Sequence, residues 1–190
     1  KKTDDKFEGT FIEYLELIRK NPSIAKLAHK RLTEAIEGHG VRSMNENDER
    51  CHKLFGGESL KTYDYFQSEF FGMEKVIAKV MRFLNSASKR GEESRQVLLL
   101  MGPVGAGKSA LTEHIKRALD GERYFYLQGD PQRGEPLHLI PRGLRSQFEE
   151  LLGVKIEGDI SPVARHLLFE EYGGEYENFV VKETTFSQRA

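Results

Sequence analysis

The chain has 190 residues, of which 38% are hydrophobic and 31% charged, and its formal net charge is −1. This length buries one sizeable core, and so balanced a charge gives no field that would attract nucleic acid or an anionic membrane. The single cysteine, Cys51, excludes an internal disulfide and suits a reducing cytoplasm, and no apolar run reaches the length of a membrane span.

The first third of the chain is expected to be helical. Thr10 and Glu13 have the spacing of a capping box, and apolar residues follow them on one helical face. A second apolar stripe occupies residues 24–36, and the polar, glycine-containing stretch after it predicts a connector. We therefore assign residues 1–60 to an N-terminal helical segment with its connector and residues 61–190 to a nucleotide-binding core.

The remaining elements are expected as helices and strands in alternation. Apolar spacing and stop signals predict helices over residues 73–86, 107–119, 144–152 and 161–172, and strands over residues 97–101, 123–128 and 179–185. The residues of the first strand are all apolar, which is typical of a strand buried on both faces. This order predicts an α/β fold with a mostly parallel sheet flanked by helices.

Between the strand at 97–101 and the helix that follows, residues 102–109 read GPVGAGKS, the pattern G-x-x-x-x-G-K-S of a phosphate-binding P-loop. Glycines let backbone N–H groups converge on a polyphosphate, and the start of the helix presents further N–H groups. Lys108 has the length to reach the β- and γ-phosphates, and the Ser109 hydroxyl is the expected Mg²⁺ ligand. The predicted nucleotide-binding residues of the loop are Gly102, Pro103, Val104, Gly105, Ala106, Gly107, Lys108, Ser109 and Ala110.

During phosphoryl transfer a carboxylate normally holds the metal together with the loop serine, and the candidates for this carboxylate in the sequence are weak. Glu170 and Glu171 follow an apolar run, but the signals around them place both at the end of a helix, and Asp130 falls in a turn. Cys51 and His52 match no zinc-binding spacing. Catalytic residues therefore stay unassigned. The H-R-D and D-F-G motifs of the usual protein kinases are missing from the sequence.

Several stretches in a fixed order resemble the AAA-type domain of the PrkA family, bacterial proteins named as serine protein kinases. They read FEGTFIEYLELIRKNPSIAKLAHKRL, FQSEFFGMEKVIAKVMRF, LLLMGPVGAGKS, PLHLIPRGLRSQF, KIEGDISPVARHLLFEEYGG and FVVKETTF. The glycine loop alone is common to many ATPases, whereas the ordered set is specific.

The resemblance implies an AAA-like P-loop NTPase core that binds ATP and Mg²⁺, acts on a protein substrate and assembles into homo-oligomeric rings. It places Phe71, Gly72 and Met73 beside the adenine. It also implies that the family's metal carboxylate, sensor residues and arginine finger come after the point where this chain stops. Because the chain begins with Lys1 rather than methionine, we expect a truncated piece of a longer protein that binds ATP but is poorly equipped to hydrolyse it.

Two functions follow as alternatives. The first is the ATP-binding domain of a cytoplasmic, PrkA-type serine protein kinase that couples ATP binding or hydrolysis to phosphorylation of proteins. The second is a regulatory or mechanical ATP-binding module, an assembly switch or a component of an ATP-dependent protease, without kinase activity of its own.

Overall fold

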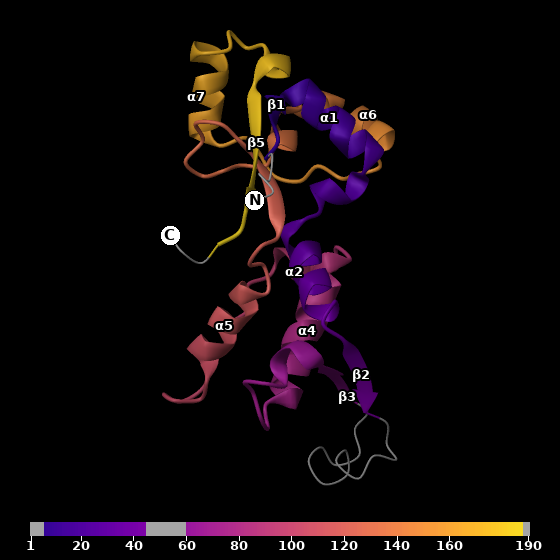
Figure 1. Ribbon diagram of the computed structural model, residues 1–190, viewed down its shortest axis with the longest axis vertical. Coiled ribbons are helices and arrows are strands. Elements are labelled where there is room, and N and C mark those ends of the chain that lie inside the picture. Colours follow the sequence, from indigo (N-terminus) through magenta and orange to yellow (C-terminus); the bar gives the residue numbers. More distant parts are fainter. Residues whose placement is uncertain (1–5, 45–59, 188–190) are drawn as a thin grey trace, which may run out of the picture. The chain divides into compact units, whose positions relative to one another are not determined.

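The computed structural model describes residues 6–44 and 60–187, which divide into two compact units. The first, here called the sheet unit, contains residues 6–26 and 121–187, and the second, the helix unit, contains residues 27–44 and 60–120. Figure 1 shows the elements of both units along the chain. The predicted boundary between residues 60 and 61 has no counterpart in this division and stays a prediction.

A three-stranded antiparallel sheet organises the sheet unit. Its order is β1 (Glu8–Thr10), β5 (Val180–Thr185), β4 (Arg123–Leu127), so β5 is the central strand and pairs with both β1 and β4. In the register of the two ladders, Val181 stands opposite Gly9 on one side and Leu127 on the other. The sequence correctly predicted the strands at 123–128 and 179–185.

Helices pack around this sheet: α1 (Phe11–Lys20), α6 (Arg145–Leu152) and α7 (Pro162–Glu170), with short 3-10 turns at Pro22–Ala25, Pro136–Leu139, Arg142–Leu144 and Tyr176–Asn178. The capping box of α1 is confirmed, since the Thr10 backbone N–H donates to Glu13 Oε2 at 2.7 Å and Glu13 N–H donates to Thr10 Oγ1 at 3.4 Å. The core contains Phe11, Tyr14, Ile18, Phe179 and Val181, all fully buried.

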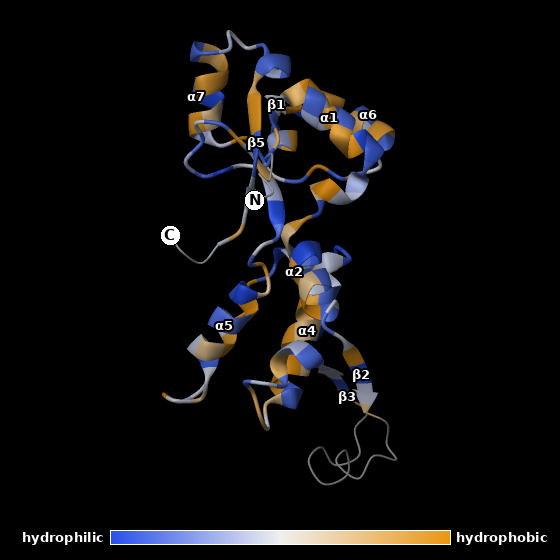
Figure 2. Ribbon diagram, viewed as in Figure 1, coloured by the Kyte–Doolittle hydropathy of each residue, from blue (hydrophilic) through white to orange (hydrophobic). Residues whose placement is uncertain are grey.

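The helix unit is built on α4 (Glu74–Ser88), which packs against α2 (Ala28–Glu37) and a hairpin of β2 (Val41–Met44) and β3 (Leu60–Tyr63). It also contains a 3-10 turn at Asp64–Phe66, another at Glu92–Arg95, and α5 (Lys108–Arg117). Hydrophobic and hydrophilic residues both occur along α1 and α4 (Figure 2), as expected of amphipathic helices. The buried side of α4 is formed by Ile77, Ala78, Val80, Met81, Leu84 and Ala87.

The predicted parallel sheet is wrong for the described residues, because all the strand pairs among them are antiparallel. Residues 97–101 form no strand, and Val97, Leu99 and Met101 are 91%, 74% and 84% exposed. A strand buried on both faces needs hydrogen-bonded neighbours and a layer on each side. No described strand pairs with this segment, so most of the apolar run stays exposed, and only Leu100 packs against the core of the helix unit.

Candidate functional site

The glycine loop lies in the helix unit and leads directly into α5. Gly105 and Gly107 have φ angles of 82° and 76°, in the left-handed region that glycine enters without strain. Gly107 is the N-cap of α5, and it offers no side chain to accept a hydrogen bond from the first turn. The N–H groups that begin α5 therefore remain available to an anion, which the helix dipole also favours.

Lys108 lies folded over this loop. Its Nζ donates to the carbonyl oxygens of Gly102 and Pro103 at 2.8 and 2.7 Å. An ammonium group has three donors, so one N–H is left for a further acceptor. The carbonyl contacts hold the positive charge at the loop, beside the uncapped start of α5.

The other predicted loop residues are accessible. Positions 102–106, Ser109 and Ala110 are exposed, and a Cβ built on Gly105 meets no atom within 4 Å. Residues 102–107 thus form the turn that leads into α5, and Lys108, Ser109 and Ala110 are the first three residues of this helix.

The segment before α4 reaches the same place. A Cβ built on Gly107 would lie 3.5 Å from Met73 Sδ, so the thioether is adjacent to the N-cap of α5. Phe71 is 80% exposed, and Gly72 has a φ of 73° with open space where a Cβ would stand. Met73 therefore lies near Gly107, and the end of the 71–73 segment is beside the loop, although the two are more than thirty residues apart in the sequence.

Glu74 follows this segment and was not predicted from the sequence. Its Oε1 accepts a hydrogen bond from the Gly72 N–H at 3.3 Å, while its Oε2 is buried and has no hydrogen-bond partner. An acidic residue in the first turn of a helix is ordinary, so the sequence offered no signal for it. Only the packed structure shows that one oxygen of this carboxylate is shielded from water.

His114 joins α5 to residues 65–70, the segment that precedes Phe71, through hydrogen bonds with Tyr65. His114 Nε2 lies 3.0 Å from the Tyr65 carbonyl oxygen, and the Tyr65 hydroxyl donates to the His114 carbonyl at 2.7 Å. Because a carbonyl only accepts, Nε2 carries a proton. The imidazole is 5% exposed and lies against three aromatic rings, those of Tyr65, Phe66 and Phe70.

Arg117 of α5 and Glu69 form a charged pair next to these contacts, on the exposed side. Arg117 donates two parallel hydrogen bonds to the Glu69 carboxylate, at 3.1 and 2.9 Å. These bonds hold the pKa of Glu69 below its ordinary value. Glu69 Oε2 also lies 3.0 Å from His114 Nδ1, a close contact without hydrogen-bond alignment. The helix that carries Lys108 and Ser109 is thereby joined to residues 65–70.

The three carboxylates considered from the sequence lie in the sheet unit. Asp130 is buried and accepts from the backbone N–H groups of Gln132 and Gly134 and from the Ser161 hydroxyl, at 2.9 to 3.1 Å. Its oxygens therefore already have donors. Glu170 is the last residue of α7 and Glu171 its C-cap, as predicted.

Within the described ranges, no group of three or more His, Cys, Asp or Glu side chains could hold a metal ion. Cys51 and His52 lie outside those ranges. Ser109 is exposed in the first turn of α5, and a serine hydroxyl is an oxygen ligand of the kind that Mg²⁺ accepts alongside phosphate oxygens. In the same ranges, no helix combines the length and apolar character needed to cross a membrane.

A family model described as the PrkA AAA domain matches residues 9–190 of the chain. The ATP-dependent protease PrkA of Bacillus subtilis (strain 168) is 36% identical over 190 residues, which cover 96% of this chain and 28% of that protein. The serine/threonine kinase YeaG of Escherichia coli (strain K12) is 34% identical over 126 residues, covering 66% of this chain and 19% of that protein.

A mitochondrial Lon protease homolog of Yarrowia lipolytica is 32% identical over 66 residues, covering 35% of this chain and 6% of that protein. No solved structure matches the chain. The chain thus spans less than a third of the length of each of these three relatives. The activities in their names are those of much longer proteins.

Proposed function

The chain belongs to the PrkA AAA domain family, and on that basis we propose that it binds ATP with Mg²⁺ at the glycine loop. The observation that carries this proposal is the loop GPVGAGKS, which enters an uncapped ten-residue helix through a left-handed Gly107. Such a terminus concentrates free N–H groups and positive potential where a polyphosphate can bind.

Each residue of the site has a distinct role in this proposal. Backbone N–H groups of the loop and the first turn of α5 bind the phosphates, and Lys108 exchanges its carbonyl contacts for phosphate oxygens. Ser109 ligates the metal, which neutralises charge on the phosphates when bound. Phe71, Gly72 and Met73 form the base side, a placement supported by the position of the Met73 side chain near Gly107.

A titration with a fluorescent ATP analogue and Mg²⁺ tests the site. Lys108→Ala removes a charge-assisted phosphate contact worth about 1.5–3 kcal/mol, so we expect the affinity to fall about 10- to 150-fold. Lys116→Ala is the matched control, because Lys116 is on the same helix and pairs with Glu113 at the exposed surface. Equal affinities for the two variants would refute the phosphate-binding assignment.

For the whole protein we propose ATP-dependent phosphorylation of protein substrates, in line with the kinase name of the Escherichia coli relative. The name of the Bacillus subtilis relative, which matches 96% of this chain, supports a second candidate, ATP-driven proteolysis. Both candidates use the same ATP site. Labelled phosphate transferred from [γ-32P]ATP to casein would identify the kinase, whereas ATP-dependent loss of casein without labelling would identify the protease.

Assembly into homo-oligomeric rings is also part of the proposal, because AAA domains commonly complete their sites with a residue from a neighbouring copy. The ATPase activity per molecule of the whole protein should then rise with protein concentration. A specific activity that stays constant while the protein is diluted to the monomer would contradict this part alone. Binding to the glycine loop would be unaffected.

A further inference from the structure

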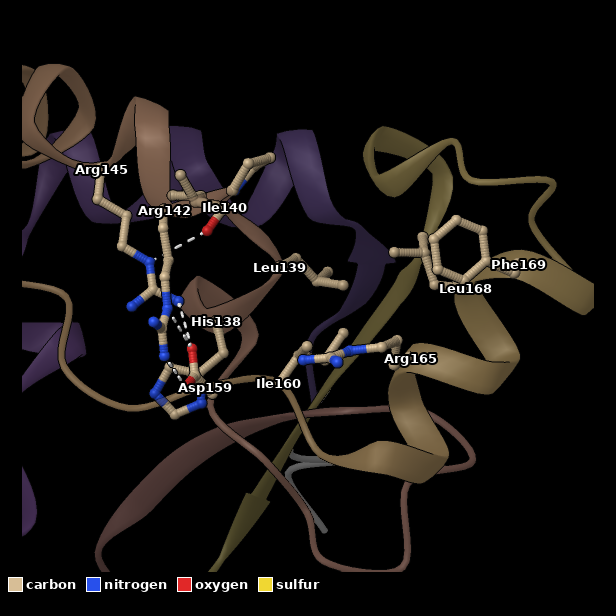
Figure 3. A pocket seen from close by; sticks show the side chains of 11 residues that line it. His138, Leu139, Ile140, Arg142, Arg145, Asp159, Ile160, Arg165, Leu168 and Phe169 are labelled. Carbon is tan, nitrogen blue, oxygen red and sulfur yellow. Dashed lines mark hydrogen bonds and ion pairs between the residues drawn. The ribbon is translucent and has the colours of Figure 1, made fainter.

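A pocket of about 350 Å³ opens on the sheet unit, remote in sequence from the glycine loop. It lies between residues 138–145, the loop at 157–160 and α7 (Figure 3). This volume is at the lower end of the range of small-ligand sites. The pocket combines one strongly cationic side with an apolar side.

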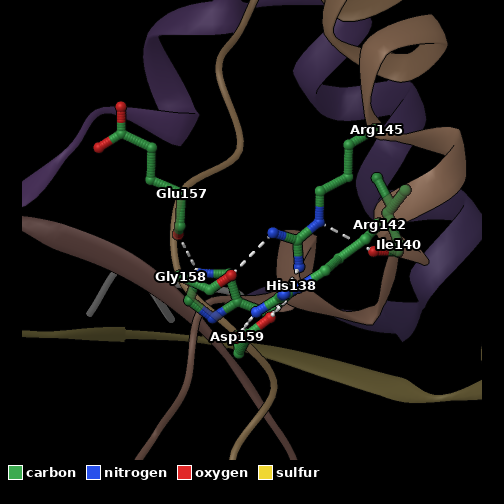
Figure 4. Close-up of polar contacts among 7 residues, drawn as sticks. All are labelled: His138, Ile140, Arg142, Arg145, Glu157, Gly158 and Asp159. Atoms are coloured by element: carbon green, nitrogen blue, oxygen red, sulfur yellow. Dashed lines mark hydrogen bonds and ion pairs between the residues drawn. The ribbon is translucent and has the colours of Figure 1, made fainter.

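The cationic side is held in a fixed arrangement (Figure 4). Arg142 makes two hydrogen bonds to the Asp159 carboxylate, one of them from Nε to Oδ1 at 3.0 Å, and Arg145 lies 3.7 Å from the same oxygen. Arg145 also donates to the carbonyl oxygens of Ile140 at 3.1 Å and Gly158 at 2.7 Å. These contacts fix both guanidinium groups before any ligand arrives.

The charge of the lining is positive overall. Arg142 holds the pKa of Asp159 below its ordinary value, so this carboxylate is ionised near neutral pH. Burial lowers the pKa of His138, which keeps the imidazole neutral. The pocket lining therefore carries three positively charged guanidinium groups, those of Arg142, Arg145 and Arg165, and one negatively charged carboxylate, that of Asp159.

Arg165 differs from the other two arginines. It is exposed, and its guanidinium makes no hydrogen bond or ion pair with any residue in the described part of the chain. Figure 3 shows it extending from α7 across Ile160 toward the pocket. On the same helix, Leu168 and Phe169 follow at i+3 and i+4, so they share its face. Phe169 is 63% exposed despite its large apolar ring.

We propose that this pocket binds a small organic anion. Its carboxylate or phosphate group pairs with Arg165, within the field of Arg142 and Arg145, and its apolar part packs against Leu168 and Phe169. A guanidinium group provides forked donors that match either anion. The apolar side then favours a ligand with an aromatic or branched body over a bare inorganic ion.

Three probes test the proposal by isothermal titration in about 0.15 M salt, where weak surface attraction is screened. Phenyl phosphate and 3-phenylpropionate carry an anion with an aromatic ring, and inorganic phosphate carries the anion alone. We expect saturable binding of at least one aromatic probe, tighter than that of inorganic phosphate. The aromatic probe that binds more tightly identifies phosphate or carboxylate as the preferred group.

Variants locate the binding. Arg165→Gln should weaken the aromatic probe about tenfold or more, while Arg19→Gln, an equal charge change on α1 outside the pocket, should leave it unchanged. Phe169→Ala should weaken the aromatic probes but not inorganic phosphate. Far-UV circular dichroism confirms that each variant is folded.

The proposal is overturned if neither aromatic probe shows saturable binding, or if Arg165→Gln and Arg19→Gln weaken the binding equally. Lys108→Ala separates this pocket from the glycine loop, because phosphate groups also suit that loop. If Lys108→Ala abolishes binding of the aromatic probes, they bind at the loop and the pocket proposal fails. If Lys108→Ala weakens only ATP, both sites stand independently.

Discussion

Replacing His114 tests how much its contacts with residues 65–70 stabilise α5. His114→Ala removes a nearly buried ring, worth about 2 kcal/mol of apolar contact, and the hydrogen bond to the Tyr65 carbonyl, worth about 1 kcal/mol. We therefore expect α5 to lose about 3 kcal/mol of stability against local opening. His114→Gln should lose about half as much, since its side-chain amide can still donate to that carbonyl.

Native-state hydrogen exchange of the α5 amides is the appropriate assay, because the two compact units need not unfold together and a single unfolding free energy would then be undefined. Lys116→Ala, at an exposed position of the same helix, should change the opening free energy by about 0.5 kcal/mol or less. The reasoning is refuted if His114→Ala also stays within about 0.5 kcal/mol of the parent protein.

Two further predictions concern the loop that borders the pocket of the sheet unit. Gly158→Ala should destabilise this unit by about 1–3 kcal/mol, because Gly158 has a φ of 98° and an added Cβ would lie 2.7 Å from His138 Nε2. Thermal unfolding should show the loss, whereas Gly143→Ala, whose Cβ would meet no atom within 4 Å, should not. The second prediction is a pH dependence: burial lowers the folded-state pKa of His138, so stability should decline as pH falls from about 6.5 toward that lower pKa. His138→Gln should flatten this part of the pH profile, and an unchanged slope would assign the dependence to other groups.

Several features of the fold could be predicted from short stretches of sequence. The capping box of Thr10 and Glu13 and the cap formed by Ser161 ahead of Pro162 both occur as expected. The apolar spacing of residues 73–86 predicted α4 within two residues at its end. These signals act over one or two turns, where hydrogen bonds and side-chain spacing are local.

The candidate site was only partly predictable. The residue types at 102–109 predicted the glycine loop because its chemistry depends on consecutive residues. The resemblance placed Phe71 and Gly72 near it, and the position of the Met73 side chain near Gly107 is consistent with that placement. Nothing local pointed to the shielded Glu74 oxygen or to the reciprocal bonds of His114 and Tyr65, since both depend on how separate segments pack.

The sequence by itself determined the local elements, the glycine loop and the family resemblance, because each depends on residues close together or in a fixed order. Only the tertiary structure decided that β5 lies between β1 and β4 in an antiparallel sheet, and that three arginines from two segments surround one pocket. The alternation of helices and strands along the sequence specifies neither which strands pair nor whether they run parallel or antiparallel. Both are decided in the folded protein, where the strands pair so that their apolar faces are buried together.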